Sequence, residues 1–289
     1  MTHDGWEYSR NCEIPNNVAL PDGLHRVAMR IEYDGSAYSG WQRQKHSISV
    51  QEKLEDALSK VADEAIEVVC AGRTDTGVHA TSQIIHFDTR ATRKERNWKL
   101  GCNSELPRDI AVGWTGFVVP QFHARFSARS RTYRYLIYNK DYRPALLSGG
   151  LTWCREKLDI DKMRVAAQYL IGKHDFSSFR AAGCAAHTPI RTVSDVRLSK
   201  YSDIVVFEIS ANAFLQHMVR NIIGLLIEIG RSELPSDHLQ EILHAKDRTI
   251  SAPTARPNGL YFVDVEYAED FCIPKEEKGP AFLAAMRRK

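Results

Sequence analysis

The sequence predicts an α+β protein whose strands pair mainly in antiparallel fashion. Apolar residues alternate with polar ones in several short segments, as in half-buried strands, and recur at helical spacing in others. These segments do not follow the strand–helix alternation of a doubly wound sheet. With 289 residues the chain can bury a substantial core, either in one large domain or in two.

The first half of the chain contains three predicted strands and one predicted helix. Residues 26–33 alternate strictly and form the first strand. The helix begins after a capping-box sequence, Ser49-Val50-Gln51-Glu52, and continues with apolar residues at helical spacing to Val61. Two further strands, residues 67–70 and 83–87, enclose a loop. A reactive group on that loop would be held by a rigid scaffold.

The second half uses the same kinds of element, without a convincing sequence repeat. We expect a strand over 132–138, a helix over 161–170, a hairpin formed by 193–198 and 204–209, a long helix over 213–229 and a closing strand over 260–267. The chain is therefore divided into an extension expected to be disordered (1–23), an N-terminal α/β half (24–120), a C-terminal α/β half (121–270) and a tail (271–289).

The composition argues against several classes of protein. No apolar run approaches the ~20 residues needed to span a bilayer, and residues 1–23 lack the apolar stretch of a secretory signal. The six cysteines are scattered, with no C-x-x-C pair and no histidine at ligand spacing. We therefore expect neither a metal cluster nor a disulfide framework. This pattern suits a reducing cytoplasm.

The loop after residue 70 is the first candidate site. It contains the run Ala71-Gly72-Arg73-Thr74-Asp75-Thr76-Gly77-Val78-His79-Ala80. Glycine lets a ligand come close to the main chain, and a carboxylate beside a guanidinium stays ionised. An ionised Asp75 would suit a nucleophile or base at neutral pH. The alternative is a surface turn in which Asp75 makes an ordinary ion pair.

The helix predicted over 213–229 is apolar almost all round, so it should be largely buried. Its polar residues share one narrow stripe: His217, Arg220, Asn221, Gly224 and Glu228. A buried guanidinium needs a partner, because an unpaired buried charge costs several kcal/mol. The partner of Arg220 is either Asp75, presented from the other half, or Glu228 or a backbone carbonyl.

Residues 121–145 combine positive charge with aromatic rings. Six basic residues and a single acid give this stretch a net charge of +5, and six aromatic residues are interleaved with them. Such a pattern is typical of a nucleic-acid surface, where cations bind phosphates and rings stack on bases. It is equally compatible with a solvated basic strand whose aromatic residues serve the core. The candidate phosphate contacts are Arg125, Arg129 and Arg131.

Six motifs, in this order along the chain, resemble those of the bacterial tRNA pseudouridine synthase A family. They are Tyr33-Asp34-Gly35 with Gly40-Trp41-Gln42; Gly72 to Ala80 with Gln83-Ile84-Ile85-His86-Phe87; Phe122-His123-Ala124-Arg125-Phe126-Ser127-Ala128; Tyr133-Arg134-Tyr135; Asn212-Ala213-Phe214 with His217-Met218-Val219-Arg220-Asn221; and Gly259-Leu260-Tyr261. The resemblance spans residues 24–267. Where many members have alanine after the aspartate, this chain has Thr76.

The resemblance implies two ferredoxin-like halves whose sheets join around a central basic cleft. It also implies a cytoplasmic homodimer that converts uridine to pseudouridine in the anticodon stem-loop of tRNA, at positions 38 to 40. No metal and no small-molecule cofactor is implied. This agrees with the sequence, which has neither a phosphate-binding loop nor a dinucleotide fingerprint.

The same resemblance assigns roles to individual residues. Asp75 would add to the nucleoside or take a ribose proton, and Arg220 with Arg73 would keep it ionised. Tyr133 would stack on the uracil and help to remove its C5 proton, while Leu260 would contact the base. From the residues alone, Tyr133 is also compatible with a core position on its strand.

Two other function classes fit parts of the sequence. A non-catalytic RNA-binding module would account for the basic and aromatic stretch. It would leave the Asp75 loop and a buried Arg220 unexplained. A carboxylate-dependent hydrolase would use Asp75, but the sequence offers no evident second catalytic acid. Release of tritium from C5-labelled uridine in tRNA separates the three classes.

Overall fold

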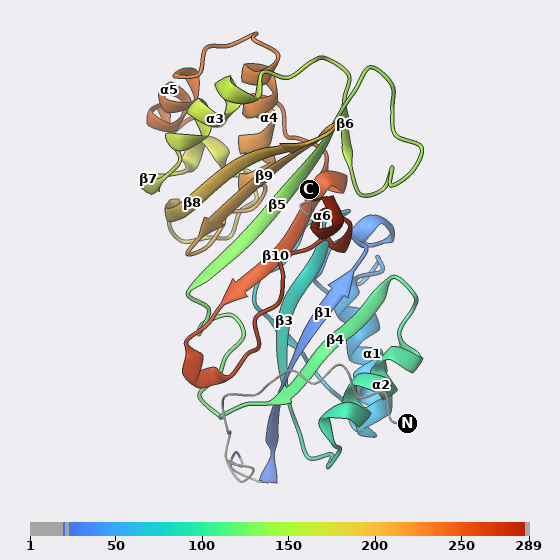
Figure 1. Ribbon diagram of the computed structural model, residues 1–289. Coiled ribbons are helices and arrows are strands. Elements are labelled where there is room, and N and C mark those ends of the chain that lie inside the picture. The colour runs from blue at the N-terminus through green and yellow to red at the C-terminus, as the bar shows by residue number, and fades with distance from the viewer. Residues whose placement is uncertain (1–19, 21–22, 287–289) are drawn as a thin grey trace.

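The computed structural model describes residue 20 and residues 23–286, so most of the expected N-terminal extension lies outside the described residues (Figure 1). The strands are β1 (His25–Tyr33), β2 (Val69–Cys70), β3 (His79–Thr89), β4 (Ile110–Phe117), β5 (Ser130–Asn139), β6 (Thr152–Cys154), β7 (Gly172–Asp175), β8 (Ile190–Tyr201), β9 (Ile204–Ala211) and β10 (Leu260–Glu266). The helices are α1 (Val50–Ala62), α2 (Glu95–Glu105), α3 (Ile160–Gln168), α4 (Met218–Gly230), α5 (His238–Ala245) and α6 (Ala281–Met286).

The described strands form one mixed sheet. Its order is β4-β1-β3-β10-β5-β9-β8-β7, with β2 paired to β3 and β6 paired to β5. All pairings are antiparallel except β10 with β3 and β5 with β6. The α+β class with a mostly antiparallel sheet is therefore confirmed. The division into two ferredoxin-like halves stays a prediction.

The last strand, β10, joins the two halves of the sheet. It pairs along most of its length with β5, and in parallel with β3 through only two residue pairs, Tyr261 with His79 and Phe262 with Ala80. Figure 1 shows β10 between β3 and β5 at the centre of the molecule. Because β3 begins at His79, the loop that carries Asp75 ends at this junction.

The predicted helix of the first half forms as its sequence indicates. Ser49 lies at the N-cap of α1, and its Oγ accepts a hydrogen bond from the Glu52 N–H at 3.2 Å. The buried face of α1 includes Val50, Leu54 and Leu58, which join the main core. Helix α1 is therefore anchored in the same core as the strands that flank the loop after β2.

Some elements differ from the sequence predictions. Helices α2 and α5 and strand β4 were not predicted, and β3 begins four residues before the predicted strand 83–87. The helix predicted over 213–229 begins only at Met218. The helix cannot begin earlier because His217 has φ 62°, in the left-handed region, which no residue of a right-handed α-helix adopts. Residues 213–217 instead form an extended turn that leads into α4.

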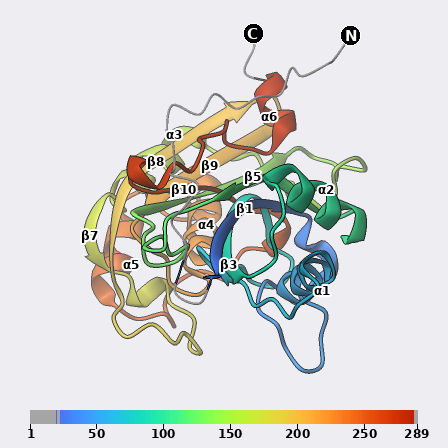
Figure 2. The same cartoon turned by 90° about the horizontal axis from the view of Figure 1, so that it is seen from below.

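The residues after β10 cover the face of the sheet opposite α1 and α4 (Figure 2). They help to satisfy a buried arginine of β5: Arg134 Nη1 donates to the Gly279 carbonyl at 2.8 Å, while its Nε donates to Glu208 Oε2 of β9 at 2.6 Å. Leu283 is buried in a small apolar cluster with residues of β5, β9 and β10. The tail is therefore part of the folded core.

Four described cysteines, Cys70, Cys102, Cys154 and Cys184, are free thiols. Cys272 is disulfide-bonded, a pairing that the sequence analysis did not predict. Within residues 23–286, no helix is long and apolar enough to cross a membrane. No cluster of three or more His, Cys, Asp or Glu side chains in this part of the chain is arranged to hold a metal ion.

A buried histidine of β3 anchors the turn after β4. His86 Nδ1 accepts a hydrogen bond from the Ala124 N–H at 3.1 Å, so this ring nitrogen must be unprotonated. Burial, together with the nearby Arg26 and His123, lowers the pKa of His86 to about 4. His123 has a similar role in this turn, because its Nδ1 accepts hydrogen bonds from the N–H groups of Arg125 and Phe126.

We predict that His86 makes the fold sensitive to acid. A histidine with a lowered pKa in the folded state contributes stability that is complete above its unfolded pKa of ~6.5. This contribution is lost as the pH falls from there to about 4, and amounts to about 3 kcal/mol in full. His86→Asn keeps an acceptor for Ala124 but cannot titrate. Urea unfolding at pH 7 and pH 4.5 should show a smaller acid loss for the variant; equal losses would contradict the prediction.

Candidate active site

The loop between β2 and β3 is held at both ends by hydrogen bonds. At its start, the Gln83 side chain brackets Gly72, donating to its carbonyl at 2.5 Å and accepting from its N–H at 3.3 Å. At its end, the Val78 N–H donates to the Asp75 carbonyl at 3.1 Å, which closes a turn. Gly77 occupies the left-handed region of that turn, with φ 76°. The backbone at Asp75 is therefore fixed.

The segment after β1 packs closely against the same loop. The Trp41 N–H donates to the Thr74 carbonyl at 3.0 Å, and the buried hydroxyl groups of Tyr33 and Thr74 lie 2.7 Å apart. A Cβ atom on Gly40 would meet the Thr74 carbonyl at 2.7 Å, so only glycine permits this approach. These contacts bury Thr74 and leave the Asp75 side chain partly exposed between the exposed residues Arg73 and Thr76.

Asp75 meets the guanidinium of Arg220 and the imidazole of His217, both from the second half of the chain. Arg220 Nη1 and His217 Nε2 each lie 3.6 Å from the same oxygen, Asp75 Oδ2. Arg220 is mostly buried, at 14% exposed, and Asp75 is 25% exposed. Arg220 Nε also donates to the Ala255 carbonyl at 2.9 Å. Three partners were considered for Arg220. In the structure it contacts Asp75 and a backbone carbonyl, but not Glu228.

A cleft of about 850 Å³ opens around Asp75. It is lined by the loop after β2, by Tyr133 of β5 and Leu260 of β10, and by the residues that lead into α4. Asp75 is the only carboxylate among its described lining residues, against five arginines: Arg73, Arg125, Arg131, Arg191 and Arg220. A lone carboxylate therefore lies in a strongly basic cleft.

Tyr133 forms part of the wall of this cleft. Its ring packs edge to face against Phe214 and Phe262, each with a centroid separation of 4.9 Å, and it is 8% exposed. Burial, and then the proximity of Tyr33 and Asp75, raises the pKa of Tyr133 far above its usual value, so its hydroxyl stays protonated. Leu260 is 4% exposed and also lines the cleft. Both residues thus offer apolar surface to a planar ligand.

The predicted RNA-binding arginines fall into two groups. Arg73, Arg125 and Arg129 are exposed. Arg131 instead donates to the backbone carbonyls of Ala71, Ala128, Asn212 and Arg125. Its guanidinium therefore ties the Asp75 loop, the turn before β5 and the segment after β9 together. This geometry favours the structural alternative for Arg131.

Two residues of the cleft were not among the sequence-predicted site residues. His217 belongs to the polar stripe that drew attention to Arg220, and that stripe was the available signal. Arg191 also lines the cleft, and its Nε is buried without a hydrogen-bond partner among the described residues. Nothing in its sequence context distinguishes Arg191 from an ordinary strand residue.

The sequence matches the family described as tRNA pseudouridine synthase over residues 29–127 and 166–268. The chain belongs to this family. It is 55% identical over 258 residues to the tRNA pseudouridine synthase A of Colwellia psychrerythraea, covering 89% of this chain and all of that protein. It is also 55% identical to the enzyme of the same name from an Enterobacter species, covering 90% of this chain and 97% of that protein. The family resemblance expected from the sequence motifs is confirmed, and with it the activity of a pseudouridine synthase, an isomerase.

The chain also resembles a solved structure, the archaeal box H/ACA Nop10–Cbf5 complex. The match has 10% sequence identity and a TM-score of 0.35, and covers 71% of this chain. The synthase spans 44% of the length of that structure's chain.

We predict that Arg220 supports both catalysis and the fold. Arg220→Met removes the guanidinium beside Asp75 and one hydrogen bond to Ala255, so turnover should fall by orders of magnitude while unfolding costs about 1–2 kcal/mol less. Arg231 serves as a matched control, because it pairs with Glu156 at the other end of α4. Arg231→Met should keep full turnover. Rates and unfolding curves on both variants test this, and full activity of Arg220→Met would contradict it.

Proposed function

We propose that this synthase modifies uridines of the tRNA anticodon stem-loop, at positions 38 to 40, with Asp75 as the catalytic carboxylate. The main support is the cleft, which is lined by a single carboxyl residue, Asp75, and five arginines among its described residues. A cleft of that charge suits a polyanion, and its single acid suits chemistry at one point of the bound substrate. The positions 38 to 40 rest on the resemblance of the sequence motifs to the synthase A family.

The reaction requires no net redox change. The C1′–N1 bond of the uridine breaks, the uracil rotates, and C1′ bonds to C5; the C5 proton then leaves and N1 gains a proton. Asp75 begins the sequence either by adding to the nucleoside or by taking a ribose proton. Both routes need an ionised carboxylate, and the guanidinium of Arg220 near Oδ2 favours that form.

The walls of the cleft suit a flipped pyrimidine. Tyr133 and Leu260 offer apolar surface close to Asp75, so the uracil would stack on the ring of Tyr133 and contact Leu260. Because Tyr133 stays protonated, its role in removing the C5 proton would need a further base to receive the hydroxyl proton. Stacking is the role that its environment supports best.

The target base must leave its stack, which costs a few kcal/mol. Phosphate contacts around the cleft would offset this cost. Arg125 and Arg129 are the best candidates because they are exposed, and Arg73 lies next to Asp75 on the same loop. A hydrolase that uses two carboxylates is disfavoured, because no second carboxylate lines the described part of the cleft. We further propose that the synthase acts in the cytoplasm as a homodimer.

We predict that Asp75→Asn abolishes turnover and leaves the fold and tRNA affinity close to wild type. The amide has nearly the same shape but acts neither as nucleophile nor as base. Asp63 is a matched control: it is exposed at the end of α1 with φ 58°, a conformation that asparagine tolerates. Asp63→Asn should be fully active. A few per cent of residual activity in Asp75→Asn, with deamidation excluded by mass spectrometry, would remove Asp75 from the mechanism.

We predict that the exposed and the internally bonded arginines behave differently. Arg125→Ala and Arg129→Ala should each weaken tRNA binding and flatten the plot of log affinity against log salt by roughly 0.7–0.9, without changing which uridine is modified. Arg131→Ala should lower the melting temperature, because it leaves several carbonyls without a donor.

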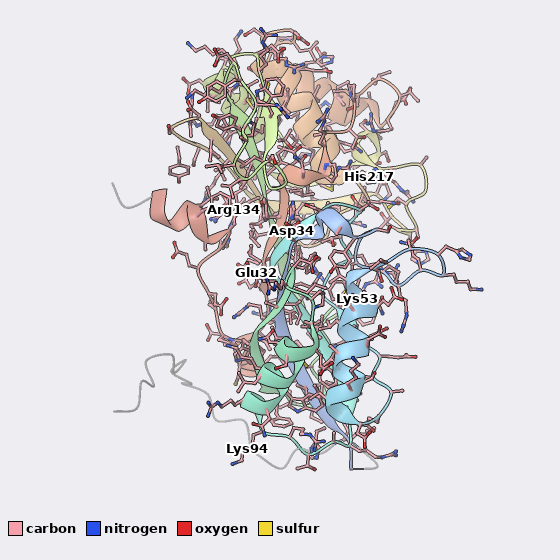
Figure 3. The ribbon with its side chains drawn as sticks, turned by 90° about the vertical axis from the view of Figure 1, so that its right-hand side faces the viewer. Glu32, Asp34, Lys53, Lys94, Arg134 and His217 are labelled. Carbon is pink, nitrogen blue, oxygen red and sulfur yellow. The ribbon has the colours of Figure 1, made fainter. Side chains whose placement is uncertain are left out.

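The controls for this prediction lie in the other basic run of the chain, residues 90–99. Lys94 is at the end of the N-terminal half farthest from His217 (Figure 3). Lys94→Ala should leave both the salt slope and the melting temperature unchanged. A flattened slope for Lys94→Ala, with unaffected slopes for Arg125→Ala and Arg129→Ala, would move the RNA-binding face to that run.

A further inference from the structure

We propose that His217 is a positioning residue for Asp75. In this role it holds Oδ2 together with Arg220, so that Oδ1 is directed toward the nucleoside. The inference rests on the proposed catalytic role of Asp75 and gives a function to His217, a residue of the polar stripe to which the sequence assigned no role. Three features of the structure support it: the geometry at Asp75, the backbone of His217, and the way α4 anchors the ring.

The first feature is that the imidazole of His217 and the guanidinium of Arg220 approach the same oxygen of Asp75. His217 Nε2 and Arg220 Nη1 are each 3.6 Å from Asp75 Oδ2, and among the described residues no ion pair or side-chain hydrogen bond reaches Oδ1. Two contacts from different directions restrict the rotation of a carboxylate more than one does. At 3.6 Å both nitrogens are too far from Oδ2 for a hydrogen bond, and a movement of about 0.5 Å would bring them within that distance.

The second feature is the backbone of His217. Its φ of 62° and ψ of 1° lie in the left-handed region, which costs a residue other than glycine about 1–3 kcal/mol. His217 lies at the N-cap of α4, a position where serine, threonine or aspartate would stabilise the helix by a side-chain hydrogen bond. The His217 side chain makes no such capping hydrogen bond. Neither backbone preference nor helix capping therefore accounts for a histidine here. The contact of its imidazole with Asp75 does.

The third feature is the rigidity of the support. The His217 carbonyl accepts a hydrogen bond from the Asn221 N–H at 2.9 Å, which makes it part of the first turn of α4. The next residues, Met218 and Val219, are buried in the core. His217 and Arg220 are three residues apart and so share one face of the helix start. Figure 3 places His217 on the C-terminal half, on the side of the molecule opposite Arg134 and the tail.

Two substitutions separate a positioning role from a structural one. His217→Gly removes the imidazole but relaxes the left-handed backbone, so it should be at least as stable as wild type. His217→Gln keeps a donor that reaches the place of Nε2 but retains the unfavourable backbone. We expect the single-turnover rate of the glycine variant to fall about 10- to 100-fold, with tRNA affinity within about threefold of wild type.

The glutamine variant should recover a large part of that rate although it melts at a lower temperature than the glycine variant. Activity and stability would then rank the two variants in opposite orders. If His217 only stabilises the fold, the more stable variant is the more active one. That result would overturn the proposal.

A second measurement identifies the step that His217 affects. tRNA with 5-fluorouridine at the target position cannot lose a C5 proton, so it reports only on the steps before deprotonation. A positioning residue slows conversion of this substrate and tritium release from C5-labelled uridine to the same extent. If His217→Gly converts the fluorinated substrate at the wild-type rate and only tritium release is slow, His217 acts on the C5 proton and the positioning role is wrong.

The wild-type enzyme distinguishes failure of this inference from failure of the proposed function. If wild type forms no pseudouridine in tRNA and Asp75→Asn behaves like it, the proposed function itself is wrong. If wild type forms pseudouridine, Asp75→Asn does not, and His217→Gly is fully active, only the role of His217 is refuted.

Discussion

The candidate active site depends on the contact between Asp75 and Arg220, which joins the two halves of the chain. Asp75 comes from the loop before β3, and Arg220 comes from the start of α4. A mostly buried guanidinium without a partner would cost several kcal/mol, so the fold must keep the two halves in register. The continuous sheet achieves this, because β10 pairs with β3 next to the loop and with β5 beneath the cleft. The same pairing that builds the core therefore fixes the distance on which the proposed chemistry depends.

Close backbone packing sets that distance, and glycine makes the packing possible. A Cβ on Gly40 would meet the Thr74 carbonyl at 2.7 Å, next to Asp75. On the other side, a Cβ on Gly224 would meet the Pro253 carbonyl at 2.0 Å. The second contact lets the segment before β10 lie against α4, where Ala255 accepts from Arg220. Two glycines nearly 200 positions apart thus bring the carboxylate and the guanidinium together.

The sequence predicted those parts of the structure whose information is local. Alternation predicted β1, and the capping box predicted α1, because both are written in neighbouring residues. The polar stripe on a buried helix predicted that Arg220 needs a partner. The start of α4 was wrong because the left-handed residue His217 is favoured by tertiary contacts and not by its neighbours in sequence. The pairing of β10 with β3 joins residues about 180 positions apart, which no periodicity encodes.

The arginines show that sequence alone does not predict the role of a single side chain. Arg125 and Arg131 lie in one basic and aromatic stretch and look alike in sequence, yet Arg125 is exposed and Arg131 donates to four carbonyls from three segments. Charge therefore predicts that a stretch of chain meets a polyanion, but not which guanidinium does so. Whether a guanidinium is free depends on the backbone carbonyls around it, because a buried carbonyl without a donor has no water to replace that donor. In this cleft the internally bonded Arg131 fixes the loop of Asp75, and the exposed arginines are the ones left free for the proposed contacts with RNA phosphates.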